Sequence, residues 1–289
     1  MESIKYYGLP ILKVLLFCVF IFLCAIPFSL LEEFKMIDLN LIHPLLFDLV
    51  SEVCGVLIVL GALLMIFRIY AQYGFEDVFI VRHHRWSALA KGMAIGFALV
   101  SLSVLLAQLN GNVHFSFRGF DPIIMAGYFL LYALVGVLEE FIFRSFPLLA
   151  LSERYPNLIG ILLTSVLFGL AHFANPGFSW LAMVNISLVG ICLAIFVLLK
   201  KNIYWAVGIH LGWNYTQGVL LGYKVSGTDS IGVLDAKPIG PTYLSGGVFG
   251  IESSIFCTLV ILVLIAYLLF RYRLEPVREV VFEEEFMEE

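Results

Sequence analysis

Two adjacent carboxylates and a guanidinium lie inside one apolar stretch of the sequence, Val137-Leu-Glu-Glu-Phe-Ile-Phe-Arg144. Residues four apart share a helix face, whereas adjacent residues diverge by about 100°. We therefore expect Glu140 and Arg144 to form an ion pair, and Glu139 to point elsewhere. One carboxylate is then neutralised, and Glu139 is left free for proton-transfer chemistry.

Two further apolar stretches carry histidines at helical spacing from a second notable residue. Phe168 and His172 share one face of the first stretch, and His210 and Asn214 share one face of the second. Polar side chains inside membrane helices are costly and are functional candidates by default. No serine or cysteine has a histidine at a recognisable motif spacing, so the sequence does not indicate covalent catalysis.

The three motifs together resemble a known family. In order, Glu139-Glu140-xxx-Arg144, Phe168-xxx-His172 and His210-xxx-Asn214 are similar to the motifs of the CAAX protease and bacteriocin-processing (CPBP) family of intramembrane endopeptidases, which includes the type II CAAX prenyl proteases. The resemblance covers about residues 122–223. It implies hydrolysis of a peptide bond in a membrane-associated substrate: a lipidated C-terminal tail, or a bacteriocin or signal-peptide precursor.

Peptide hydrolysis needs an activated water and donors that stabilise the oxyanion. Glu139 is expected to act as general base, with His172 helping to hold the water and passing a proton to the leaving amine. His210 and the Asn214 amide are expected to donate to the oxyanion. The resemblance implies the same roles. The supporting residues are Glu140 and Arg144, which keep a second negative charge away from Glu139, and Phe168, which packs.

Metal use has two readings. Two histidines and one glutamate are a legitimate zinc triad with an open fourth position. The HExxH motif is absent, and the family has been described both with and without a tightly bound metal. The sequence favours a metal-free site, so no cofactor and no metal ligand is assigned, and zinc is the alternative.

The composition predicts what must position these residues. The 289 residues are 61% hydrophobic and 13% charged, whereas soluble domains are about half apolar and a quarter charged. This excludes a soluble enzyme and predicts an all-α, polytopic membrane helix bundle embedded in the lipid bilayer. The net charge of −5 is no footprint of nucleic-acid binding. The expected partner is a peptide or a prenylated or otherwise membrane-anchored protein.

Eight stretches are long and apolar enough to span a membrane. They are approximately 11–31, 45–67, 87–109, 122–150, 157–174, 178–199, 203–223 and 247–270. We divide the chain into helices 1–3 (1–120), a catalytic core of helices 4–7 (121–225), an external loop (226–246), helix 8 (247–271) and an acidic cytoplasmic tail (272–289).

The basic residues predict the orientation. With both termini inside, 13 of the 17 basic residues fall on or near the cytoplasmic side, as the positive-inside rule requires. The four left outside are Lys35, Arg118, Lys224 and Lys237. We therefore expect a multi-pass protein, N-in and C-in, in the cytoplasmic membrane of a prokaryote.

Helix geometry predicts that the motifs converge. Glu139 and His172 lie equally far from a turn near Tyr155 and Pro156, so they sit at the same height in an antiparallel pair. His210 would lie roughly 11 Å lower. If the three residues are to meet, the antiparallel pair of helices must project farther into the cytoplasm. A continuous helix of about 48 Å from residue 122 to 153 allows this. A cytoplasm-facing cavity near the inner leaflet is the matching hypothesis.

Two rival functions use other features. Asp48 and Glu52 share one helix face, and Asn185 and Glu252 add polar groups, as a proton-coupled transporter would require. No inverted repeat of the kind that transporters tend to have is visible. A non-catalytic regulatory scaffold is the other alternative, and the intact set of Glu139, His172, His210 and Asn214 argues against it.

Overall fold

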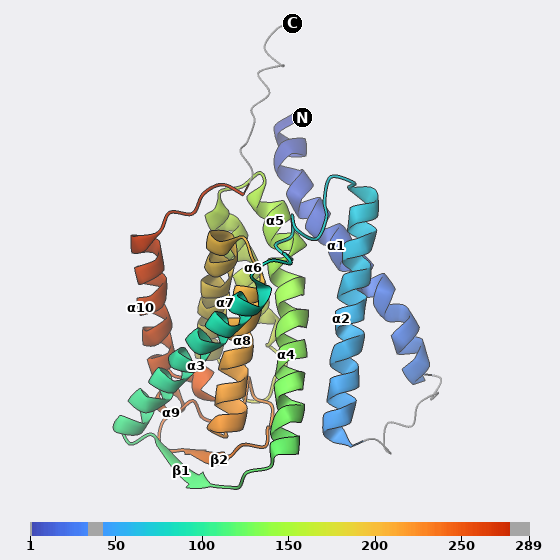
Figure 1. Ribbon diagram of the computed structural model, residues 1–289. Coiled ribbons are helices and arrows are strands. Elements are labelled where there is room, and N and C mark those ends of the chain that lie inside the picture. The colour runs from blue at the N-terminus through green and yellow to red at the C-terminus, as the bar shows by residue number, and fades with distance from the viewer. Residues whose placement is uncertain (1, 34–42, 278–289) are drawn as a thin grey trace, which may run out of the picture.

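The computed structural model describes residues 2–33 and 43–277, which form a helix bundle with a small sheet at one end (Figure 1). In chain order the elements are α1 (Glu2–Glu33), α2 (Pro44–Ile69), α3 (Arg85–Leu109), β1 (Val113–Phe117), α4 (Pro122–Arg144), α5 (Phe146–Ser152), α6 (Asn157–Ala171), α7 (Trp180–Lys200), α8 (Tyr204–Tyr215), a π-helical segment (Thr216–Leu220), β2 (Leu234–Pro238), α9 (Thr242–Ser245), a 3-10 turn (Ile251–Ser253) and α10 (Ile255–Arg271). The predictions about Lys35 and about the tail beyond residue 277 lie outside the described residues.

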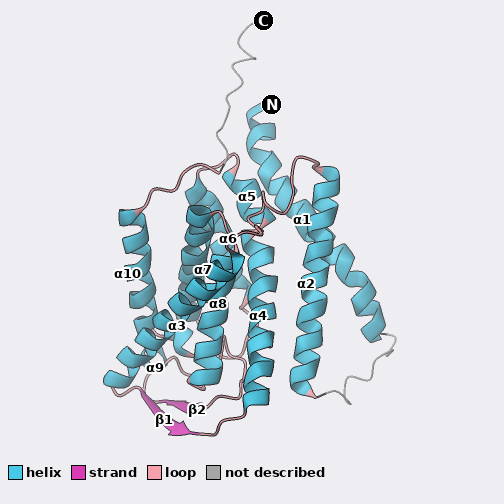
Figure 2. Ribbon diagram, in the orientation of Figure 1, coloured by secondary structure: helices cyan, strands magenta, loops and turns pink. Residues whose placement is uncertain are grey.

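The chain is an integral membrane helix bundle, as its composition predicts. Within the described residues, five helices are long and apolar enough to cross a membrane: Tyr6–Leu30, Pro44–Ile69, Arg85–Leu109, Pro122–Ser152 and Trp180–Lys200. The apolar helices α6 and α10 are shorter. Each of the eight predicted stretches contains a helix, but eight crossings and the N-in orientation stay predictions. Figure 2 shows how completely helix dominates the fold.

The predicted continuous helix from residue 122 to 153 is wrong. Helix α4 ends at Arg144, Ser145 takes a non-helical backbone (φ −85°, ψ −115°), and α5 begins at Phe146. Pro147 is the physical reason. Its ring has no N–H to donate and would clash with the carbonyl of Phe143 in an unbroken helix.

Two more boundaries differ from the predicted stretches. The seventh stretch leaves α-helical geometry after Tyr215, where a π-helical segment follows. The eighth begins later than expected: α10 starts at Ile255, where the Ser254 hydroxyl caps it by accepting from the N–H of Cys257 at 3.2 Å. Non-helical backbone of this kind is tolerated within a membrane bundle where protein surrounds it or it lines a cavity.

The segment predicted as an external loop contains strand β2, and its sheet makes the all-α description incomplete. Strands β1 and β2 pair antiparallel, with Phe115 opposite Ala236. The strands come from two connections more than a hundred residues apart in sequence, so no local sequence pattern predicts that they pair. The sheet and α9 close the end of the bundle from which α4 begins (Figure 1).

Glycines bring the backbones of α3 and α8 into contact. Gly92 and Gly96 lie one turn apart on α3, and Gly208 and Gly212 lie one turn apart on α8. A Cβ atom at Gly96 would overlap the carbonyl oxygen of Ile209. Paired small residues at this spacing permit close packing of membrane helices. The contact fixes the position of α8, which carries two of the predicted site residues.

Candidate active site

A cavity of about 340 Å³ lies between α2, α4, α6 and α8. Five of the seven residues singled out from the sequence line it: Glu139, Phe168, His172, His210 and Asn214. The other two, Glu140 and Arg144, are fully buried and do not line it. The three sequence motifs therefore converge on one place, as their order and spacing predict.

The ion pair predicted on α4 is present. Arg144 Nε lies 3.4 Å from Glu140 Oε2, and both side chains are completely shielded from solvent. The Arg144 guanidinium also lies 4.2 Å from the centre of the Phe168 ring. A cation held over an aromatic face is attracted by the ring quadrupole. Phe168 therefore joins α6 to the ion pair on α4, a more specific contact than the packing role that the sequence suggests.

His210 contacts both carboxylates of the adjacent pair. Its Nδ1 donates to Glu140 Oε1 at 3.0 Å, and its Nε2 lies 3.7 Å from Glu139 Oε2. The contact with Glu140 was not foreseen, because it joins residues on two different helices. It sets the orientation of the imidazole ring and directs Nε2 toward the Glu139 side.

Glu139 has a different environment from Glu140, as the helix geometry predicts. Its side chain is 26% exposed, whereas that of Glu140 is 0% exposed. Glu139 lines the cavity, and its Oε2 atom has no hydrogen-bond partner. The exposed part of a carboxylate in a cavity wall can accept a proton from a bound water.

His172 is the residue that follows the last turn of α6. Its Nδ1 donates to the carbonyl oxygen of Phe168 at 2.9 Å, since a carbonyl can only accept. The two rings meet edge to face with centroids 5.1 Å apart. With Nδ1 committed, Nε2 is the nitrogen that can gain or lose a proton. Asn214, one turn beyond His210 on α8, is also buried in the cavity wall.

Glu252 is a cavity residue that the sequence places only in the rival transporter hypothesis. Its Oε2 accepts from Gln217 Nε2 at 3.0 Å and from the Ser226 N–H at 2.6 Å. Burial raises the pKa of this carboxyl above its ordinary value, and the hydrogen bonds from Ser226 and Gln217 oppose that rise. Glu252 lies in the 3-10 turn before α10, outside the spanning helices, and no motif spacing identifies it.

The other three residues of the transporter hypothesis do not all line the cavity. Asp48 and Glu52 line the same cavity from α2. Asn185 does not line the cavity; it is fully buried and donates to the carbonyl oxygen of Glu252 at 2.7 Å. It therefore holds the turn that carries Glu252.

The zinc alternative does not fit the observed arrangement. In residues 2–33 and 43–277, no three histidine, cysteine, aspartate or glutamate side chains are grouped as ligands of one metal ion. Glu139 and His210 are neighbours, but His172 does not join them as a third ligand. No step of the chemistry below is therefore assigned to a metal.

Comparison with known proteins supports the resemblance over the helices that carry the site. Residues 121–216, a third of the chain, match the family model described as type II CAAX prenyl endopeptidase Rce1-like. No curated protein and no solved structure gives a significant match. The match runs from the residue that caps α4 to the residue after α8. The segment that is similar to the type II CAAX prenyl endopeptidase Rce1-like family therefore contains Glu139, His172, His210 and Asn214.

Proposed function

We propose that the chain is an intramembrane endopeptidase in which Glu139 activates water for attack on a peptide bond. The substrate would be membrane-associated: a lipidated C-terminal tail, or a bacteriocin or signal-peptide precursor. The observation that carries the proposal is Glu139 in the cavity wall, with its Oε2 3.7 Å from His210 Nε2. A base and a potential donor thus face the same space.

Glu139 begins the reaction by taking a proton from a water molecule. The water oxygen bonds to the carbonyl carbon of the peptide, and the carbonyl oxygen becomes an oxyanion. The carbon–nitrogen bond then breaks. The leaving amine receives the proton that Glu139 removed, relayed through His172 Nε2, while Nδ1 stays bound to Phe168.

His210 and Asn214 supply the oxyanion donors. In the protonated form of His210, Nδ1 donates to Glu140 and Nε2 carries the hydrogen that donates to the oxyanion. The two carboxylates of α4 and the two cations, Arg144 and His210, then balance in charge. Preorganised donors of this kind are among the largest contributions to catalysis.

Glu140 and Arg144 act through other residues. Glu140 fixes the His210 ring, and Arg144 compensates the charge of Glu140 at full burial. An uncompensated charge at such a site would be costly. These two are positioning residues, and they are not expected to contact the substrate.

Purified protein in detergent tests the proposal. Wild type, Glu139→Ala and Glu139→Gln are each incubated with a panel of tail and precursor peptides, and cleavage is followed by mass spectrometry. Glu76→Gln, which alters an exposed glutamate in the α2–α3 connection, is the matched control. We expect cleavage by wild type and the control only. Equal cleavage by the Glu139 variants would refute the general-base role.

Zinc is measured on the same samples by elemental analysis. We expect no stoichiometric metal. Stoichiometric zinc in wild type that is lost in His172→Ala would overturn the metal-free mechanism.

The transporter alternative has one observation in its favour, since Asp48 and Glu52 share the cavity with Glu139. Proteoliposomes with a pH-sensitive dye discriminate the two functions. Substrate-coupled proton movement without any cleavage would favour transport, whereas cleavage without proton flux supports the peptidase.

A further inference from the structure

The cavity lies toward one end of the bundle. Helix α2 lines it from its first turns, at Phe47 to Glu52, and α6 from its last turn, at Phe168, both in the half nearest the sheet. Helix α4 lines it from Tyr128 to Glu139, so the cavity reaches past the middle of that helix and opens toward the sheet. The connections that complete the wall, at Asn175 and at Val225 to Asp229, follow α6 and the π-helical segment. The site therefore faces the end of the molecule that holds β1, β2 and α9 (Figure 1).

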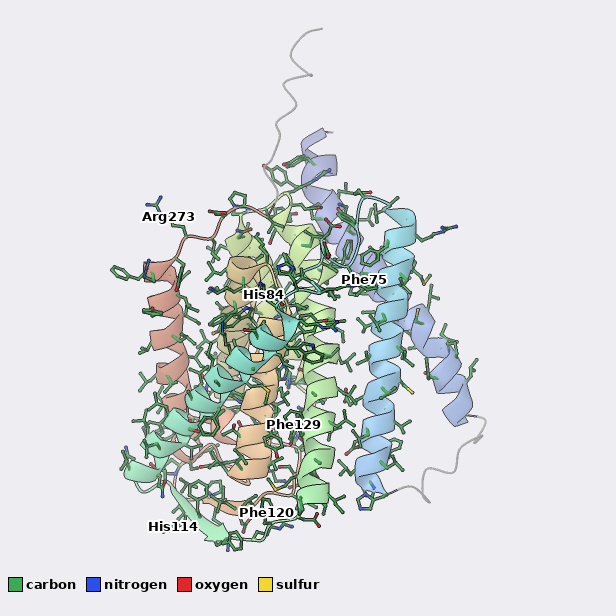
Figure 3. The ribbon with its side chains drawn as sticks, in the orientation of Figure 1. Phe75, His84, His114, Phe120, Phe129 and Arg273 are labelled. Carbon is green, nitrogen blue, oxygen red and sulfur yellow. The ribbon has the colours of Figure 1, made fainter. Side chains whose placement is uncertain are left out.

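The basic residues gather at the opposite end. There, Lys13 pairs with Glu153 at 3.0 Å, Arg154 donates to the carbonyl oxygen of Tyr6 at 3.0 Å, and the Lys200 ammonium lies 5.6 Å from the Tyr272 ring. These contacts join the start of α1, the α5–α6 turn, the α7–α8 turn and the end of α10. In Figure 3, Arg273 lies at this end, far from His114 and Phe120 beside the sheet.

The basic residues of the described part of the chain are distributed unequally between the two ends. The helix ends and connections that lie away from the sheet in Figure 1 are those of the first part of α1, the end of α2, the start of α3, the α5–α6 and α7–α8 turns and the end of α10. In or near them are Lys13, Arg68, Arg82, Arg85, Lys91, Arg154, Lys200, Lys201, Arg271 and Arg273. The sheet end carries Arg118, Lys224 and Lys237. Arg144 is buried between the two. Lysine and arginine in short loops mark the cytoplasmic side of a membrane protein.

We infer that the catalytic cavity opens on the non-cytoplasmic side of the membrane. The expectation of a cytoplasmic N-terminus and that of a cytoplasm-facing cavity cannot both hold, because the cavity lies at the end remote from the basic residues. The charge asymmetry involves most of the basic residues of the chain, so it decides between the two. The inference therefore keeps the N-in orientation as its premise and reverses the side of the cavity.

The cavity entrance supports access from water at that end. Asp48 on α2 is exposed, and Asp229 in the loop after the π-helical segment is 84% exposed at its side chain. Both line the cavity. We call these two residues the acidic rim. Ionised carboxylates are strongly disfavoured in hydrocarbon, so the acidic rim marks the cavity edge that contacts water.

This inference narrows the class of substrate. The conclusion about the substrate, unlike that about the side of the cavity, rests on the proposed peptidase function. A substrate must present its scissile bond on the non-cytoplasmic face. Exported peptide precursors and signal peptides satisfy this requirement. A lipidated tail that stays on the cytoplasmic face does not.

Cysteine labelling in intact cells tests the side of the cavity without any assay of activity. The background carries Cys18→Ala, Cys24→Ala and Cys54→Ala, and it keeps Cys192 and Cys257, which are buried. Asp229→Cys reports on the acidic rim and Lys237→Cys on the same end outside the cavity. Arg82→Cys and Arg273→Cys are the matched positions at the other end.

A membrane-impermeant maleimide should label the Asp229→Cys and Lys237→Cys proteins in intact cells. It should label the other two only after permeabilisation. The reverse pattern would overturn the inference. The background protein, treated in the same way, measures any reaction of the two remaining cysteines.

A pair of reporters then tests the substrate class. A peptide that the purified protein cleaves is fused to a single membrane anchor, so that it faces the cytoplasm in one reporter and the opposite side in the other. We expect Glu139-dependent loss of the second reporter only. Cleavage of the cytoplasmic reporter would overturn the inference. External labelling of Asp229→Cys by a protein whose purified form cleaves no peptide of the panel would confirm the side and count against the peptidase function, so the two failures are distinguishable.

Discussion

His210 donates from Nδ1 to Glu140 Oε1 at 3.0 Å, and this bond connects α8 to the carboxylate that Arg144 neutralises. Glu140, which has no access to the cavity, therefore orients His210. The same histidine faces Glu139, which does line the cavity. This division predicts different consequences for the two positions. Loss of Glu139 should affect chemistry, and loss of Glu140 should affect both chemistry and stability.

Glu140→Ala should lower the free energy of unfolding by about 3–5 kcal/mol, the usual cost of removing one partner of a buried ion pair. Arg144 would remain fully buried without its counter-charge. Thermal unfolding in detergent, followed by circular dichroism, measures the change. Glu76→Ala, at an exposed position, should stay within about 0.5 kcal/mol of wild type.

A double-mutant cycle checks the cause. If the loss arises from the pair, adding Arg144→Ala to Glu140→Ala should cost less than the sum of the two single changes. Strict additivity would show that the two side chains contribute independently.

Asn214→Ala should reduce kcat by about 100- to 1000-fold with little change in KM. An oxyanion donor acts mainly on the transition state, and removal of one such donor has this magnitude. Initial-rate kinetics on the best peptide of the panel measure both constants. A raised KM with unchanged kcat would instead assign Asn214 to ground-state binding of the substrate.

Gly96→Ala should destabilise the protein by about 1–3 kcal/mol, the range for overpacking a close contact. The added methyl group would meet the main chain of Ile209, which cannot rotate away. Because α8 must shift, activity should fall as well. The matched control is Gly8→Ala on α1, where a Cβ meets nothing within 4 Å. It should stabilise the helix by about 0.5–1 kcal/mol, and equal destabilisation by both changes would disprove the packing argument.

Glu252→Ala should destabilise the segments that carry Gln217 and Ser226, whereas Glu252→Gln should largely preserve their stability. Alanine leaves the N–H of Ser226 and the amide of Gln217 without their acceptor, at about 1–3 kcal/mol for each buried group. Glutamine keeps an acceptor oxygen. Melting temperatures of the two variants give the comparison, and indistinguishable values would exclude this role for the carboxyl.

The same position carries a pH dependence. The pKa of Glu252 is raised in the folded state, so between its unfolded and folded pKa values the folded protein binds more protons. The contribution of this carboxyl to the free energy of unfolding is therefore fully present below its unfolded pKa. That contribution is lost as the pH rises through its folded pKa. The stability of wild type relative to Glu252→Gln should fall across that interval, and a constant difference would contradict the burial argument.

The sequence predicts the local features of the site and misses those that join distant elements. The Glu140–Arg144 pair follows from helical spacing alone, and the convergence of His172 and His210 with Glu139 follows from motif order and the resemblance. The bond from His210 to Glu140 could not be predicted, because it depends on the rotation of α8 relative to α4. The catalytic roles themselves stay predictions.

Two misses have different causes. The break at Ser145 had a visible signal in Pro147, but the hydrophobicity of residues 146–150 outweighed it. The position of Glu252 had no such signal, because its partners Gln217 and Ser226 lie in a π-helical segment and a loop, where side-chain spacing has no fixed period. Motifs on regular helices can be read from sequence, and the irregular segments that complete a cavity require the fold.

The backbone contact between α3 and α8 has a consequence for how the protein responds to its membrane. Changes in bilayer thickness tilt helices that are held together loosely. Main-chain contact at Gly96 gives α8 little freedom to tilt, and the hydrogen bond to Glu140 anchors His210 to α4. Helix α2, with Asp48 and Glu52, meets α4 through side chains such as Leu138 against Gly55. A thicker or thinner bilayer would therefore reshape the entrance of the cavity while His210 and Asn214 keep their positions.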